Sequence, residues 1–504
     1  MAGARWARVT GRAAGWDFAF MPFPIRLPPT RTTRKHFQSK ICAKIAKPHR
    51  VPVLEAGSNR CQLTPVLPFS LIDSFLLRAF RFRTRGFLRM EEAPGTMPPA
   101  PREGNGYLYI HVPFCEVLCP FCSFHRVQHH HGQAQRYFAS LREEIRRYHA
   151  AGFRFTGVYV GGGTPTTEPG ELVTTLNLVR ELFGVKDISV ETNPKDLRPE
   201  ILEPLRAAGV TRLSVGVQSF DDRLLKDMSR YEKYGSSEVI QAHLRAAVGM
   251  FPTLNVDLIF NQPHQDIASL ERDIAILHDL GVNQVSFYPL MTSPTAARRM
   301  AGVMGLPDHR RLRTFFTTIL ARLQPEFTPT SAWCFTRRGH GCDEYIVDAD
   351  YYVGVGSGSF SFLDGTLYTT TFSLETYAQR IAAGLTGITT RHRLSRGDLM
   401  RYTLLMRMFG LRLDRAAIQR RYGASFFRRL WGELRTLEWL GAAKRDDRGW
   451  QLTERGMYWL MLMMSAFFES VNDYRDAMRA HIRDEKNESD TLCVPAISPA
   501  GIGK

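Results

Sequence analysis

The feature that most constrains the fold of this chain is a regular alternation of short apolar runs with helical patterns between residues 107 and 289. The runs are YLYIHV, TGVYV, DISVE, TRLSVGV, LNVDLIF and NQVSFYP, and each has the length of a β-strand. Helical patterns lie around residues 135–150, 170–183, 199–208, 236–250 and 269–280. Strands joined through helices pair in parallel, because the crossover returns the chain to the same end of the sheet. The pattern predicts an α/β fold, either an open doubly wound sheet or a partial (β/α) barrel.

In both architectures, ligands bind beyond the carboxyl ends of the strands. A glycine loop, GGGTPT at residues 161–166, follows the second run; Glu191 ends the third, Gln218 follows the fourth and Asp257 lies in the fifth. The loop lacks the Gly-Lys-Ser/Thr of a phosphate-binding P-loop, and a plain tight turn is its simplest alternative. One such polar residue is usually satisfied by a local hydrogen bond. Polar groups at successive strand ends, beside a glycine loop, instead indicate a binding site.

Three cysteines, Cys115, Cys119 and Cys122, lie within eight residues of a chain that has only eight in 504. Three thiolates on one loop can hold three irons of a [4Fe–4S] cluster and leave the fourth iron open. A zinc site completed by His125 or by one of the histidines at 129–131 is the alternative, and it would suit a winged-helix regulator. Zinc motifs favour paired cysteines, and no second pair stands at a suitable spacing. The spacing therefore favours an iron–sulfur cluster.

Charge, cysteine usage and hydropathy exclude several classes of protein. The net charge is +17, but residues 1–90 carry 17 Lys and Arg against 3 Asp and Glu, so the remainder is close to neutral at +3. A basic nucleic-acid-binding face is therefore not expected. Few cysteines, three of them clustered, indicate a reducing compartment. Because no uncharged apolar run reaches the length of a membrane span, we expect a soluble, cytoplasmic protein.

Composition divides the chain into further regions. Residues 1–104 are basic and lack periodicity, so we expect a disordered extension; a transit-type presequence and translated sequence upstream of a native start at Met90 are the alternatives. The barrel is expected over residues 105–300. Residues 301–394 are expected to extend and connect it, with two strands around a glycine-rich turn in YYVGVGSGSFSFLDG.

The remaining residues predict a helical domain and a tail. Residues 395–480 are mainly helical, and SFFRRLWGELRTLEWLGAAKRDDRGWQLTERG indicates helix, turn, short hairpin and helix, the outline of a winged-helix-like module. Its arginines are more typical of a solvated helical face than of DNA contact. A flexible tail is expected over residues 481–504.

Taken together, YIHVPFC, GGGTPT, ETNP, GVQSF and DLIF resemble the oxygen-independent coproporphyrinogen III oxidase family of radical S-adenosylmethionine enzymes, over residues 105–480. The resemblance implies a partial (β/α)6 barrel with a helical C-terminal domain. It also implies a [4Fe–4S] cluster and one or two molecules of S-adenosylmethionine, which is cleaved to a 5′-deoxyadenosyl radical. The implied partners are a one-electron reductant, such as flavodoxin or ferredoxin, and a porphyrin-type substrate or haem.

The same resemblance implies roles for individual residues. Cys115, Cys119 and Cys122 match the cluster ligands. The positions that match S-adenosylmethionine contacts are Tyr109, Phe121, Gly162, Gly163, Thr164, Glu191, Gln218, Arg230 and Asp257. We expect Asp257 and Gln218 to bind the cofactor rather than to stabilise the fold.

Several positions depart from the family pattern. Oxidases of the family carry Cys-Gly-Cys where this chain has Cys122-Ser123-Phe124, and the haem-chaperone branch has a His-Asn pair where His340 has no following Asn. LTERGMYWLMLM is similar to the radical methyltransferases of haem utilisation. We therefore expect a radical enzyme acting on a tetrapyrrole, with a haem chaperone or a methyltransferase as alternatives. Cys334 and Cys342 are expected to be ordinary thiols.

Overall fold

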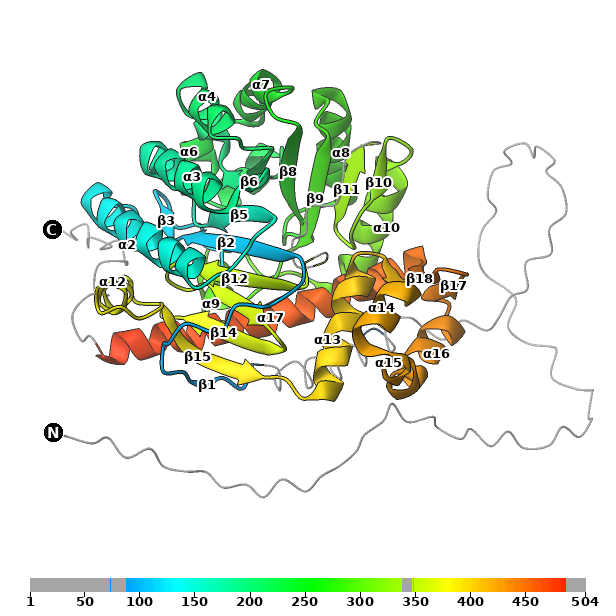
Figure 1. Cartoon of the computed structure of the whole chain (residues 1–504). Coiled ribbons are helices and arrows are strands. Elements are labelled where there is room, and N and C mark those ends of the chain that lie inside the picture. The colour runs from blue at the N-terminus through cyan, green and yellow to red at the C-terminus, as the bar shows by residue number, and fades with distance from the viewer. Residues whose placement is uncertain (1–72, 74–87, 338–346, 348, 486–504) are drawn as a thin grey trace, which may run out of the picture. The chain divides into compact units, whose positions relative to one another are not determined.

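The computed structural model describes residue 73, residues 88–337, residue 347 and residues 349–485 (Figure 1). The chain divides into two units, Met1–Phe69 and Ser70–Lys504, and every element described below belongs to the second. His340, Cys342 and the tail beyond residue 485 lie outside the described residues, as do residues 1–72 and 74–87 of the predicted extension.

All six predicted strands form, and they lie side by side in parallel and in chain order. They are β2 (Gly106–Val112), β5 (Gly157–Gly162), β6 (Asp187–Thr192), β7 (Arg212–Gln218), β8 (Thr253–Phe260) and β9 (Gln284–Pro289). Their apolar side chains make up much of the core. The partial (β/α)6 barrel is confirmed, because the strands are parallel and the sheet continues past β2 and β9 instead of joining them.

The predicted helices also form, on the outer face of these strands (Figure 1). They are α2 (His131–Ala150), α3 (Pro169–Phe183), α4 (Pro199–Ala207), α7 (Ser237–Ala247) and α8 (Ile267–Leu280). Local sequence signals set their ends. Pro169 begins α3, the Asp266 carboxylate caps α8 by accepting from the Ser269 N–H at 2.7 Å, and Gly184 and Gly281 end α3 and α8 in the left-handed conformation.

Residues 301–394 extend the sheet at both edges. The chain adds β12 (Tyr351–Val355) in parallel beside β2, followed by antiparallel β13 (Phe360–Leu363), β14 (Thr366–Thr370) and β15 (Ile388–Arg393), while β11 (Cys334–Arg337) and β10 (Phe327–Pro329) extend the edge at β9. The predicted pair of strands around a glycine-rich turn is therefore β12 and β13. Helices α10 (Leu312–Leu323) and α12 (Leu374–Ala382) belong to the same region.

Regular structure begins before residue 105, which corrects the prediction of a disordered extension up to residue 104. A two-residue strand, β1 (Glu91–Glu92), pairs antiparallel with β15, and the buried Gly95 carbonyl accepts a hydrogen bond from Thr386 Oγ1 at 2.9 Å. The exposed edge of β15 offers backbone groups that need partners, and β1 supplies them. So short an extended segment has no periodicity that a sequence pattern could detect.

The C-terminal domain has the predicted order of helix, turn, hairpin and helix. It comprises α13 (Arg396–Phe409), β16 (Arg412–Asp414), α14 (Arg415–Tyr422), α15 (Ala424–Arg429), α16 (Trp431–Trp439), β17 (Ala443–Arg445), β18 (Gly449–Leu452) and α17 (Glu454–Glu485). The long helix α17 leaves this domain and runs along the sheet, where Tyr474 hydrogen-bonds Thr369 of β14 and Thr390 of β15 (Figure 1). In the described part of the chain, no helix is both long and apolar enough to cross a membrane.

Candidate functional site

The three clustered cysteines lie on one loop beyond the carboxyl end of β2. Cys115 ends the short strand β3 (Phe114–Cys115), which pairs with β4 (Val127–Gln128), and the residues between these strands carry the other two thiols. Cys115 and Cys119 are buried, Cys122 is half-buried, and all three are free thiols. Burial, followed by the neighbouring Cys122, raises the pKa of Cys115 to about 12. A cationic group bound at the loop would relieve both effects.

Three of the four histidines of the zinc alternative have side-chain partners outside the cysteine loop. The Nε2 atom of His125 lies 3.1 Å from Ser357 Oγ, and His129 Nε2 and His131 Nδ1 each lie 2.7 Å from Glu168 Oε1. Within the described residues, no three His, Cys, Asp or Glu side chains converge where one metal ion could bind. In a [4Fe–4S] cluster each cysteine binds a different iron, so its sulfurs stand apart.

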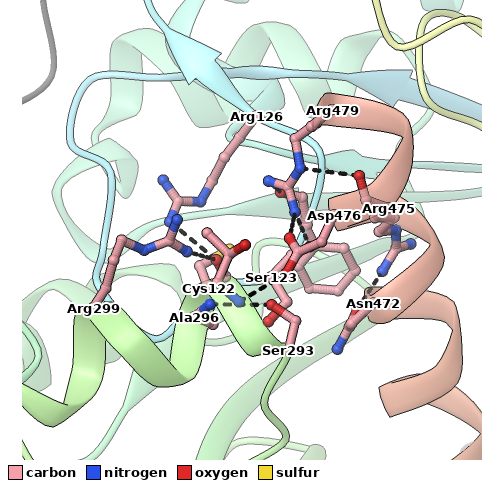
Figure 2. Close-up of polar contacts among 12 residues, drawn as sticks. Cys122, Ser123, Arg126, Ser293, Ala296, Arg299, Asn472, Arg475, Asp476 and Arg479 are labelled. Carbon is pink, nitrogen blue, oxygen red and sulfur yellow. Dashed lines mark hydrogen bonds and ion pairs between the residues drawn. The ribbon is translucent and has the colours of Figure 1, made fainter. Parts of the chain in front are cut away.

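Arginines that the sequence did not single out surround the cysteine loop (Figure 2). Arg126 donates to the carbonyl oxygens of Cys119 and Cys122, the latter at 3.1 Å. Arg299 and Arg479 reach the same loop from distant parts of the chain. Although burial opposes a charged thiolate, Arg126, the Phe124 N–H and Arg479 hold the pKa of Cys122 below its ordinary value. The arginines therefore favour the thiolate form of Cys122.

Arg230 contacts the cysteine loop directly. Its Nη1 donates to Cys119 Sγ at 3.6 Å, and its Nη2 donates to Asn193 Oδ1 at 3.0 Å and to the Gly216 carbonyl. The guanidinium is buried over the Tyr234 ring, and its Nε has no hydrogen-bond partner. This residue, predicted to contact S-adenosylmethionine, thus joins the cysteine loop to the carboxyl ends of β6 and β7.

The glycine loop lies against the backbone that carries the cysteines. The Gly163 N–H donates to the Val112 carbonyl at 2.8 Å, and Thr164 Oγ1 donates to Cys115 Sγ at 3.7 Å. A Cβ atom at Gly163 would lie 2.5 Å from the Phe114 carbonyl oxygen, and one at Gly162, where φ is 116°, would lie 2.6 Å from the His111 ring. The approach of the two segments therefore requires glycine at both positions.

Glu191 and Asp257 place two carboxylates in the interior of the barrel. Glu191 accepts from the Tyr159 hydroxyl at 2.8 Å and from the Gly162 N–H at 3.1 Å. Asp257 accepts from Ser214 Oγ and Asn255 Nδ2, both at 2.7 Å. Burial, followed by the charge of Asp257, raises the pKa of Glu191 to about 7, and burial also raises the pKa of Asp257. Two carboxylates that disfavour each other's charge would be stabilised by a cationic ligand.

The other predicted cofactor contacts lie around this interior. Tyr109 stacks on Tyr159, with ring centroids 6.2 Å apart, and its hydroxyl lies 2.9 Å from His111 Nδ1. Gln218 adopts a positive φ of 78° at an irregularity between β7 and β8, and Phe121 is half-buried within the cysteine loop. The structure thus brings the predicted residues to one end of the sheet. Sequence reasoning missed Tyr159, Ser214 and Asn255, although polar residues inside apolar strand runs marked their positions.

Cys334 stands apart from the cysteine loop. It is buried in β11, opposite Ser286 of β9. The prediction that it is an ordinary interior thiol is consistent with that position, and Cys342 lies outside the described residues.

A cavity of about 820 Å³ lies in the C-terminal domain, away from the cysteines, and Phe427, Trp431 and Trp450 line part of it. Arginines and acidic residues alternate around it, including Arg415, Arg435, Asp414, Glu438 and Asp447. Its volume does not mark the reactive site, because the thiols, glycine loop and paired carboxylates all lie in the barrel.

The loop of free cysteines on a partial (β/α)6 barrel defines a radical S-adenosylmethionine protein, and the model of the radical SAM superfamily matches residues 109–277. The heme chaperone HemW of Mycobacterium tuberculosis is 32% identical over 312 residues, 58% of this chain and 78% of that protein. The oxygen-independent coproporphyrinogen III oxidase of Escherichia coli is 26% identical over 385 residues, 69% of this chain and 82% of that protein. The chain belongs to the radical SAM family that contains HemW and this oxidase.

A solved structure agrees with the fold. Coproporphyrinogen III oxidase (HemN) from Escherichia coli superposes with a TM-score of 0.61 at 24% identity, covering 72% of this chain and 90% of that protein. The expected fold is therefore confirmed.

Proposed function

We propose that the chain binds a [4Fe–4S] cluster through Cys115, Cys119 and Cys122 and binds S-adenosylmethionine at the carboxyl ends of the barrel strands. The observation that carries this proposal is the contact between the cysteine loop and the glycine loop, where Thr164 donates to Cys115 Sγ. A reduced cluster held by these three thiolates would supply the one electron that cleaves S-adenosylmethionine. A one-electron carrier such as flavodoxin or ferredoxin is the proposed source of that electron.

The residues of the barrel have separate roles in this proposal. The glycine loop offers backbone groups to a ligand with no side chain in the way. Glu191 and Asp257 supply negative charge for the amino and sulfonium groups of S-adenosylmethionine, and Tyr109, Phe121 and Gln218 bound the same space. In this proposal Arg230 donates to the carboxylate of S-adenosylmethionine, which is supported by its burial and by its Nε, which has no hydrogen-bond partner.

The proposed substrate is a porphyrin-type tetrapyrrole. Support comes from relatives of two kinds, a coproporphyrinogen III oxidase and heme chaperones, because the name of each refers to a tetrapyrrole. Oxidative decarboxylation is the first reaction to test, and radical methylation of the tetrapyrrole is another outcome of the same assay.

Haem delivery without turnover is a second candidate function. It is favoured by the heme chaperone relatives and by Ser123-Phe124, which replace the additional cysteine expected of the oxidases. A chaperone of this kind would keep the barrel and the cluster but would hold haem as its cargo.

One experiment separates these possibilities. The protein is reconstituted anaerobically with iron and sulfide, reduced, and supplied with S-adenosylmethionine and coproporphyrinogen III or haem. We expect four irons per chain and release of 5′-deoxyadenosine, with carbon dioxide for decarboxylation or a methylated product for methyl transfer. Haem retained through gel filtration without product supports the chaperone. If the protein retained no iron or sulfide after reconstitution, the proposed cofactor would be refuted.

A further inference from the structure

Arginine side chains hold the carbonyl groups along one side of the cysteine loop (Figure 2). Arg299 donates to the Cys122 carbonyl at 3.0 Å and to the Pro120 carbonyl at 3.4 Å. Arg479 donates to the carbonyls of Ser123 and Phe124, each at 3.3 Å. We call this pair, Arg299 and Arg479, the arginine clamp. It comes from α9 (Pro294–Ala301) and α17, and Arg479 lies 356 residues beyond Ser123.

Asp476 joins the two helices that carry the clamp. One of its carboxylate oxygens accepts from Arg479 Nη2 at 2.7 Å, and the other accepts from the Thr295 N–H in the first turn of α9 at 2.9 Å. The residue before Asp476 on α17, Arg475, covers the Phe124 ring, with its guanidinium carbon 4.9 Å from the ring centroid. The C-terminal helix therefore contacts the backbone and a side chain of the cysteine loop, and also α9, the other helix that contacts this loop.

The clamp places positive charge beside the proposed cluster. A guanidinium that donates to neutral carbonyls keeps its full charge, and Asp476 is the acidic partner seen for Arg479. A cluster bound by three thiolates gains a further negative charge when it is reduced, so a nearby cation favours the reduced form. The planar fork of arginine also holds two carbonyl groups in a fixed geometry, whereas the three donors of a lysine ammonium rotate freely.

We propose that Arg299 and Arg479 are positioning residues for the cluster, so that α17 forms part of the cluster site. They fix the backbone that carries Cys119 and Cys122, and their charges raise the reduction potential of the cluster. This inference rests on the proposed function only in requiring that a cluster binds.

The test compares purified, anaerobically reconstituted variants of the full chain. Arg299→Gln and Arg479→Gln remove one charge each, Arg479→Lys keeps the charge without the fork, and Asp476→Asn removes the counter-charge but keeps an oxygen for Thr295. Arg298→Gln is the matched control, because Arg298 is exposed on the same helix and its hydrogen bond goes to Thr295 Oγ1 at 3.4 Å. The readouts are the midpoint potential from an EPR-monitored titration, the rate of iron loss to a chelator, and the melting temperature without cluster.

The clamp predicts shifts of opposite sign. Each Gln variant should lower the midpoint potential by ~59 mV, a tenfold change in the equilibrium constant of a one-electron couple, and should lose iron about tenfold faster. Asp476→Asn should raise the potential. Arg479→Lys should keep the wild-type potential but lose iron faster, and Arg298→Gln should match the wild type.

Three results would overturn the inference. One is a wild-type potential and rate of iron loss in both Gln variants. Another is a potential in Arg479→Lys as low as in Arg479→Gln, and the third is a fall in potential for Asp476→Asn. A Gln variant that fails to fold leaves the Lys and Asn variants to decide. Absence of a cluster from the wild-type protein would instead refute the proposed function, so the two failures are distinguishable.

Discussion

Replacing Asp257 by Asn tests whether the two interior carboxylates bind a cationic ligand. The substitution keeps the shape of the side chain and an oxygen that can accept from Asn255 Nδ2, now at 2.7 Å, but it removes the negative charge. It also removes the charge that helps to raise the pKa of Glu191 to about 7. The variant should therefore affect ligand binding far more than the unliganded fold.

The expected magnitude follows from the type of bond that is lost. A hydrogen bond to a charged group contributes about 1.5–3 kcal/mol, so the Kd for S-adenosylmethionine should rise about 10- to 150-fold. In the unliganded protein, the weaker acceptor is offset by relief of the repulsion between Asp257 and Glu191. We therefore expect a melting temperature close to that of the wild type.

Anaerobic calorimetric titration of the reconstituted variant with S-adenosylmethionine measures the affinity, and thermal unfolding without ligand measures the stability. Glu144→Gln is the matched control. The buried Glu144 carboxylate accepts from the N–H groups of Gly356 and Gly387 and from the Tyr377 hydroxyl, outside the barrel interior. That variant should lose stability and keep its affinity. An unchanged Kd for Asp257→Asn, together with a stability loss like that of the control, would show that Asp257 is structural.

Three further predictions concern the cluster and the interior charge. Replacing any one of Cys115, Cys119 or Cys122 by Ala should abolish iron binding, whereas Cys334→Ala should retain it; iron analysis after reconstitution decides both. Gly163→Ala should lower the iron content, because its Cβ would lie 2.5 Å from the Phe114 carbonyl oxygen, while Gly170→Ala, with no atom within 4 Å, should match the wild type. The pKa of Glu191 is raised from 4.5 to about 7, so its protonated form stabilises the folded state. This contribution to the free energy of unfolding is fully present below pH 4.5 and is lost as the pH rises through 7, by at most about 1.4 kcal/mol per pH unit. In urea unfolding without ligand, the free energy of unfolding of Glu191→Gln should fall less steeply with pH over this range than that of the wild type. An identical pH dependence in the two proteins would contradict the raised pKa of Glu191.

The barrel could be predicted from the sequence because its signals are local. Each strand is a short apolar run, and each helix between them has its own periodicity and end signals, such as Asp266 and Gly281 around α8. The strand β1 could not be predicted in this way. Its two residues are held by the free edge of β15, about 300 residues later in the chain. Pairing with a distant edge leaves no trace in the composition of so short a segment.

The same distinction separates the parts of the site. The cysteine spacing and the glycine loop are contiguous motifs, so their chemistry could be inferred directly. Arg299 and Arg479 lie on helices whose arginines are typical of solvated faces, and only the folded chain brings them to the cysteine loop. Ser214 and Asn255 are intermediate cases. Each is a polar residue inside an apolar strand, which indicates a side chain with a specific polar partner. Which residue that partner is depends on the register between β7 and β8.

The site separates charge in a way that suits both proposed cofactors. The barrel interior presents Glu191 and Asp257, which match the positively charged amino and sulfonium groups of S-adenosylmethionine. The C-terminal side of the cysteine loop presents the arginine clamp, which matches a cluster made anionic by its thiolates. If these charges were exchanged, carboxylates would face the thiolates and the guanidiniums would face a cationic ligand. In the proposed site, the barrel and the C-terminal helix α17 would therefore each supply part of the charge that the two cofactors need.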